Sequence, residues 1–137
     1  MKGRFFPVLA VSAGLLTATL PLLAHHSFAA EYDESKPVKL TGAVTKLEWM
    51  NPHAHFYVDI KDKDTGTVTN YEFELAALNA LIRRGWTRNS LKPGDVVTVE
   101  GFLAKDGSAL VNAKTVTMSD GRKIFAGSAP EEGGPTK

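Results

Sequence analysis

The sequence predicts a mostly β domain, with five strands closed into a small barrel and one short helix between the third and fourth strands. Three observations support this fold class. Residues 38–75 contain three runs in which apolar and polar residues alternate, as they do in half-buried strands. Residues 76–84 change to a helical spacing. Two more alternating runs follow at 96–104 and 109–118.

The first strand is expected over residues 38–49, directly after Pro37. Its apolar residues change from one side to the other near Gly42. A glycine at such a point predicts a bulge or bend, of the kind that lets strands curl into a barrel. Asn51-Pro52 then interrupts the run.

The second strand, residues 53–61, has the most regular alternation in the chain. Phe56 and Val58 belong to its apolar side, and His53 and His55 belong to its polar side. Turn-forming residues at 62–66 connect this strand to the third, at 67–75. The two strands are therefore expected to form a hairpin.

The helix is expected over residues 76–84, because Gly85 stands where a helix C-cap is common. Pro93-Gly94-Asp95 forms a turn into the fourth strand, and residues 105–108 form a hairpin turn before the fifth. Three strands, a helix and two strands is the element order of an OB-type barrel. A simple meander is the competing fold.

The amino-terminal residues predict export, because a basic start is followed by residues 5–23 without a charge. We expect a signal peptide over residues 1–24 that is cleaved after Ala24, with cleavage after Ala29 as the alternative. A membrane anchor of this length is the competing interpretation. The expected product is periplasmic or secreted, without a stable membrane anchor. It consists of a polar lead-in at 25–36, the barrel at 37–126 and a disordered tail at 127–137.

Composition excludes several classes of site. The chain has no cysteine, which excludes disulfides, thiolate metal sites, cysteine nucleophiles and a lipoprotein anchor. Its formal charge of +1 includes Lys2 and Arg4, so the processed protein is close to neutral. Nucleic-acid binding normally needs a basic face, and no nucleic-acid partner is expected.

All four histidines stand in two close pairs, His25-His26 at the predicted mature start and His53 and His55 on the second strand. Residues two apart on a strand point the same way and lie about 6.6 Å apart, so their imidazoles can converge on one ion. Imidazole suits copper(II) and zinc(II), and copper has the higher affinity. In the competing interpretation, these are ordinary exposed residues.

Strand pairing adds two carboxylates to this hypothesis. If the apolar sides of the hairpin strands face the core together, His55 faces Glu72 or Glu74, and the register decides between them. Either carboxylate can orient the imidazole or bind the ion directly.

Residues 83–88 gather three arginines around Trp86, a pattern that suits contact with an anion or nucleic acid. In the competing interpretation, the arginines complement the helix dipole and the indole closes the core. No strained nucleophile turn, calcium loop or Gly-rich phosphate loop is present, so we expect no enzyme.

Several motifs resemble those of a domain-of-unknown-function family of small exported bacterial proteins. They are His25-His26-Ser27-Phe28-Ala29, Asn51-Pro52-His53, residues 84–95 (RGWTRNSLKPGD) and Asp120-Gly121-Arg122-Lys123. The resemblance covers nearly the whole mature chain and implies a secreted or periplasmic protein that starts at His-His-Ser-Phe. It implies no activity. His55 is less typical of the pattern than His53, and the layout is similar to that of exported bacterial OB-fold proteins.

The resulting hypothesis is a non-enzymatic periplasmic binding protein for a transition-metal ion, copper first, held by His25, His26, His53 and His55. The alternative is a metal-free OB-fold interaction module. It would bind a protein, peptide or glycan partner through Trp49, Tyr57 and Trp86. A copper enzyme built on an N-terminal histidine is a third interpretation.

Overall fold

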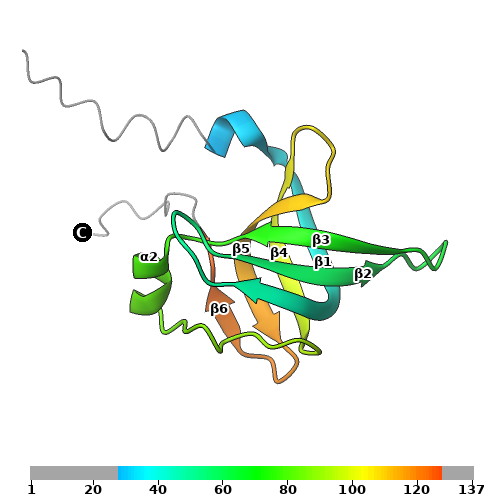
Figure 1. Cartoon of the computed structure of the whole chain (residues 1–137). Coiled ribbons are helices and arrows are strands. Elements are labelled where there is room, and N and C mark those ends of the chain that lie inside the picture. Colours follow the sequence, from blue (N-terminus) through cyan, green and yellow to red (C-terminus); the bar gives the residue numbers. More distant parts are fainter. Residues whose placement is uncertain (1–27, 128–137) are drawn as a thin grey trace, which may run out of the picture.

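The computed structural model describes residues 28–127 (Figure 1). The predicted signal peptide, the His25-His26 pair and the predicted tail beyond Gly127 lie outside the described residues. The described part contains one six-stranded sheet and two short helices, which confirms the mostly β class. None of its helices has the length and apolar character needed to span a membrane.

The elements follow the predicted order, with the longer helix between the third and fourth strands. They are a helical turn at 28–31, β1 Tyr32–Glu48, β2 His55–Lys61, β3 Val68–Glu74, α2 Leu78–Arg83, β4 Val96–Ala104, β5 Leu110–Met118 and β6 Lys123–Phe125.

The strands are paired in the order β3-β2-β1-β4-β5-β6, and β3 also pairs with β5. The β3–β5 pair is parallel, whereas the other pairs are antiparallel. Each strand from β1 to β5 therefore has neighbours on both sides. Figure 1 shows β2 and β3 running together into a long hairpin.

The predicted strand count of five is wrong, because residues 123–125 form β6 on the edge of β5. Its register places Phe125 opposite Thr115. Three residues are too few to show an alternating pattern, so only the pairing with β5 reveals this strand.

The predicted lead-in at 25–36 also needs correction, because β1 begins at Tyr32. Tyr32 is 3 % exposed and pairs with Ala104 of β4. The register shifts between Tyr32 and Pro37. The residues between them are polar, so the sequence shows no alternating pattern that would predict a strand there.

β1 serves two partners, pairing with β4 up to Ala43 and with β2 from Ala43 onward. Gly42 lies at this change of partner, as expected for a bend. A Cβ atom at Gly42 would stand 2.1 Å from the carbonyl oxygen of Asp59, so no side chain fits there. The register irregularity of this strand follows between Val44 and Lys46.

The apolar sides of β2 and β3 face the core, as predicted. Phe56 pairs with Phe73, and their rings stack with centroids 5.0 Å apart. Trp86, after α2, is also in the core, and its indole nitrogen donates to the carbonyl of Phe125 at 3.1 Å. The polar sides of β2 and β3 consequently point outward and carry the candidate site.

Candidate functional site

The register of the sheet places His55 between two glutamates. It pairs with Glu74 of β3 on one side and with Glu48 of β1 on the other. Its ring, however, approaches the diagonal neighbour, since His55 Nδ1 lies 2.9 Å from Glu72 Oε1. The angles are not those of a hydrogen bond, so Nδ1 has no hydrogen-bond partner among the described residues.

Glu74 joins two side chains from different parts of the chain. Its Oε2 accepts a hydrogen bond from the Tyr32 hydroxyl, and its Oε1 contacts His53 Nδ1. Glu74 is 13 % exposed at its side chain, so a carboxylate there needs such partners. A carboxylate only accepts hydrogen bonds, so Nδ1 of His53 carries the proton. Nε2 of His53 is then the atom free to bind a ligand.

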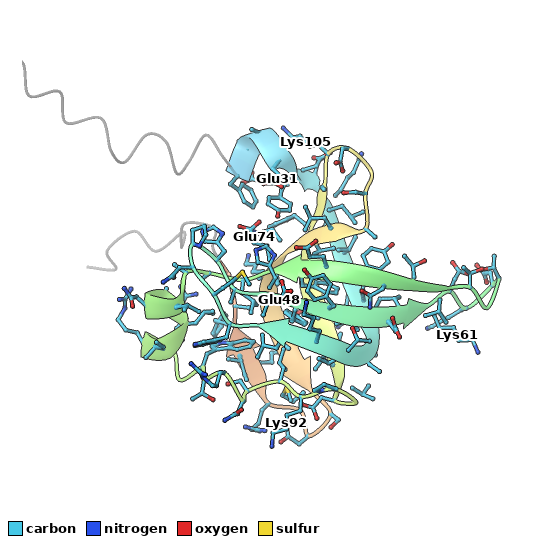
Figure 2. The ribbon with its side chains drawn as sticks, viewed as in Figure 1. Glu31, Glu48, Lys61, Glu74, Lys92 and Lys105 are labelled. Carbon is cyan, nitrogen blue, oxygen red and sulfur yellow. The ribbon has the colours of Figure 1, made fainter. Side chains whose placement is uncertain are left out.

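Burial and charge perturb two groups beside Glu74. Burial, with the hydrogen bond to Glu74 next, raises the pKa of Tyr32 well above its usual value. Burial also raises the pKa of Glu31, and the nearby carboxylates of Glu74 and Asp106 add to this effect. Figure 2 shows Glu31 in the helical turn, above Glu74. Glu31 thus adds a carboxylate to this side of the molecule.

A second group of contacts is centred on Glu48, on β1. Glu48 contacts the Lys46 ammonium and accepts a hydrogen bond from the Tyr57 hydroxyl at 3.1 Å. The Lys46 contact, more than any other, lowers the pKa of Glu48. Burial, followed by the charge of Glu72, raises the pKa of Tyr57 to about 12. Tyr57 is therefore held neutral and is already hydrogen-bonded.

The helical turn before β1 is fastened to the same region. The Phe28 ring lies 5.5 Å from the Tyr32 ring and 6.1 Å from the Phe102 ring, measured between centroids. Lys105 holds the turn twice, through its backbone N–H to the Glu31 carbonyl at 2.8 Å and through its ammonium to the Ala29 carbonyl. The chain thus enters the described structure beside the Tyr32–Glu74–His53 contacts.

Of the predicted metal ligands, the structure places His53 and His55 on one surface with Glu72 and Glu74. His25 and His26 fall outside the described residues. Within residues 28–127, no group of three or more histidine, aspartate or glutamate side chains is arranged to hold a metal ion.

The predicted aromatic ligand face requires correction. Trp86 is 1 % exposed and belongs to the core, because the end of α2 and β6 cover it. Trp49 is partly buried against the core. Tyr57 alone has its polar end at the outward surface of β2, where it contacts Glu48.

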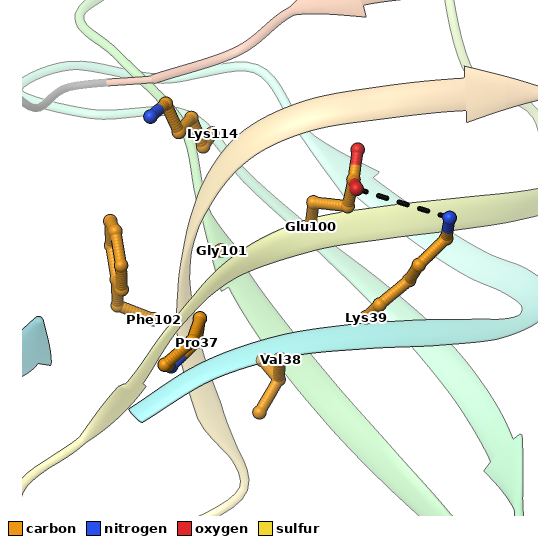
Figure 3. A pocket seen from close by; sticks show the side chains of 7 residues that line it. All are labelled: Pro37, Val38, Lys39, Glu100, Gly101, Phe102 and Lys114. Atoms are coloured by element: carbon orange, nitrogen blue, oxygen red, sulfur yellow. Dashed lines mark ion pairs between the residues drawn. The ribbon is translucent and has the colours of Figure 1, made fainter. Parts of the chain in front are cut away.

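A pocket of about 310 Å³ lies where β1 meets β4, between Lys39 and Glu100 (Figure 3). Lys39 and Lys123 both stand 3.9 Å from the Glu100 carboxylate, which therefore lies between two exposed cations. None of the predicted site residues lines it.

Sequence reasoning missed Tyr32 and Glu31, which it assigned to the polar lead-in. The sequence offered one hint of a buried residue there, because Tyr32 is an aromatic residue in an otherwise polar stretch, two positions after Ala29-Ala30. That signal does not show which partner a tyrosine hydroxyl will find.

The profile of a family of unknown function, DUF6152, matches residues 13–113. The chain belongs to this family. The matched span includes both histidine pairs, Tyr32 and Glu74, which confirms the resemblance to a family without an assigned function. No curated protein matches the chain.

Proposed function

We propose that this DUF6152 protein is an exported, non-enzymatic binding protein that holds a transition-metal ion, copper(II) first and zinc(II) second. Its central ligand is His53. The observation that carries this proposal is the Tyr32–Glu74–His53 chain of contacts. In it, the largely buried carboxylate of Glu74 contacts one ring nitrogen of His53 and so fixes the imidazole.

This arrangement matches what metal-binding histidines commonly have. A ligating imidazole usually donates its second N–H to a carboxylate, which sets the tautomer, fixes the ring and raises the basicity of the coordinating nitrogen. Glu74 is in position to do this for His53, and Tyr32 fixes Glu74 in turn.

The remaining ligands in this proposal are His55, His25 and His26. His55 follows His53 by two residues and is the first residue of β2, and in this proposal its ring turns toward the same ion. His26 is two residues before Phe28, a chain length of about 7 Å at most, and Phe28 packs on Tyr32. If cleavage follows Ala24, the free amine of His25 adds another nitrogen donor.

The scaffold in this proposal is an OB-type barrel. Supporting observations are the ring of pairings β1-β2-β3-β5-β4-β1, the parallel β3–β5 pair and the helix between β3 and β4. β6 is then an addition on β5. OB barrels commonly serve as binding modules, which fits a non-enzymatic role.

Calorimetry on the exported, processed protein tests the metal site. We expect copper(II) to bind with submicromolar affinity, and the His53→Ala/His55→Ala variant to lose that binding. Glu74→Gln should weaken binding about 10-fold or more, because it alters the group that orients His53. Glu48→Gln is the matched control, since Glu48 lies on the same surface but contacts Lys46 and Tyr57.

Two results would contradict the proposal. If the double variant keeps full affinity, the ion is held by the leader alone and not by β2. If neither copper(II) nor zinc(II) binds below about 10 μM, roughly −7 kcal/mol, the surface is no physiological metal site.

A further inference from the structure

A second candidate site lies where α2 ends beside β6. A pocket of about 410 Å³ is lined by Arg84, Gly85, Arg122, Lys123, Ile124 and Phe125. The hydrogen bond from Trp86 to the Phe125 carbonyl ties the two elements together. Two of its lining residues, Arg84 and Gly85, belong to the arginine-rich motif at 83–88, which has no part in the proposed metal site.

The walls of this pocket are basic. Arg84 is held at the rim by a hydrogen bond from its Nη1 to the Gly127 carbonyl at 2.9 Å. Arg122 pairs with Asp120 at 2.6 Å, and Lys123 lies 3.9 Å from a carboxylate oxygen of Glu100. The last contact is long and exposed, so it neutralises little of the Lys123 charge.

The pocket also presents apolar surface that the core does not use. Phe125 is 66 % exposed, the highest value among the exposed large hydrophobic residues of the described chain. Ile82, on α2 next to the basic end of the helix, is 55 % exposed. A single exposed apolar residue is common on protein surfaces, but the Phe125 ring lines the same pocket as three cationic side chains, and this combination suits an anionic lipid surface.

We propose that this surface docks the protein on an anionic phospholipid membrane. Lys123, Arg122 and Arg84 would contact lipid phosphates, while Phe125 enters the interface between headgroups and acyl chains. Basic residues are attracted to anionic bilayers, and Phe is among the residues that insert at the headgroup boundary in surface-bound segments.

The charge distribution sets the orientation on the bilayer. The outward side of β2 and β3 carries Glu72 and Glu74, with Glu48 on β1 beside them. An anionic surface repels that side and attracts the end formed by α2 and β6. The buried Trp86 takes no part, so the exposed ring in this contact is Phe125.

Sedimentation with vesicles tests this proposal, using the exported, processed protein. The vesicles contain phosphatidylcholine alone or with roughly one third phosphatidylglycerol. We expect binding to the anionic vesicles only, and a decrease as salt is raised. Arg122→Glu/Lys123→Glu should reduce binding by about 25-fold or more, from roughly fivefold for each cation lost.

The matched control is Lys61→Glu/Lys63→Glu, which makes the same change in charge on the β2–β3 hairpin. Figure 2 places Lys61 at the far end of that hairpin, away from α2. The control should bind within about twofold of the unchanged protein. Equal losses in both double variants would overturn the proposal, because only net charge would then matter.

Phe125→Trp provides a readout that does not depend on loss of binding. The added indole should shift its emission to shorter wavelength on anionic vesicles, relative to the unchanged protein. No shift, or no vesicle binding at all, would overturn the proposal. Binding of inorganic phosphate without vesicle binding would also overturn it and would identify a site for free anions.

Discussion

Glu74 is the residue on which the candidate metal site depends. A carboxylate with little exposure loses hydration, and it regains the energy only through good partners. Glu74 has one partner from β1 and one from the segment before β2, and both contacts involve groups distant in sequence. The position of the His53 ring therefore depends on how firmly the Glu74 side chain is held.

Replacing Tyr32 by phenylalanine should destabilise the fold by about 1–3 kcal/mol, because the substitution leaves Glu74 Oε2 without its donor. Urea denaturation measures this loss. Tyr71→Phe is the control, since the Tyr71 side chain contacts Phe73 and donates no hydrogen bond within the described structure. An equal effect of the two substitutions would show that the Tyr32 hydroxyl adds nothing.

Among the elements, β1 does the most to position the site. Its first half brings Tyr32 to β4, and its second half brings Glu48 beside His55 on β2. The change of partner takes place at Gly42, where the backbone of β2 comes so close that a Cβ atom would collide with the Asp59 carbonyl. Bending one long strand between two partners is what places both networks on one surface.

Gly42→Ala should therefore destabilise the protein by about 1–3 kcal/mol, the usual cost of forcing an extra carbon into a packed region. Gly127→Ala is the control, because its nearest neighbour to an added Cβ is at an ordinary 3.6 Å. Thermal unfolding compares the two. A Gly42→Ala protein as stable as the control would mean that β1 and β2 can separate there without cost.

At the scale of the whole molecule, the strand pairings and the placement of charge act together. The outward surface of β2 and β3 carries His55, Glu72 and Glu74, with His53 just before β2, and the end formed by α2 and β6 carries arginines and a lysine. A chain with a formal charge of +1 thus gathers carboxylates and cations on different elements. Net charge alone does not reveal such a division.

Alkaline pH should destabilise the whole molecule through Tyr32 and Tyr57, whose pKa values the fold raises above the usual 10.0, that of Tyr57 to about 12. The unfolded chain loses these protons first. The stabilisation is complete below about pH 10 and is lost as the pH rises further. Urea midpoints measured from about pH 9 to 11.5 should fall, and the fall should be smaller in Tyr32→Phe/Tyr57→Phe. Identical slopes would contradict the prediction.

Much of the fold could be predicted from the sequence. β4 matches its expected range, and β2, β3, α2 and β5 begin or end within about two residues of theirs. Local periodicity carries this information, because alternation reports which side of a strand is buried. The assignment of His55 to the outward side of β2 follows from the same rule, whereas His53, also expected in this strand, lies two residues before β2 begins.

The sequence by itself determined the strand-rich class, the position of the helix and the sides of the hairpin, since each depends on residues close together in the chain. Only the tertiary structure decided that Glu74 contacts His53 while Glu72 faces His55, that Tyr32 completes the first contact, and that Trp86 is hidden while Phe125 is exposed. Those outcomes depend on register and on contacts between residues as many as 42 positions apart, which no local pattern encodes.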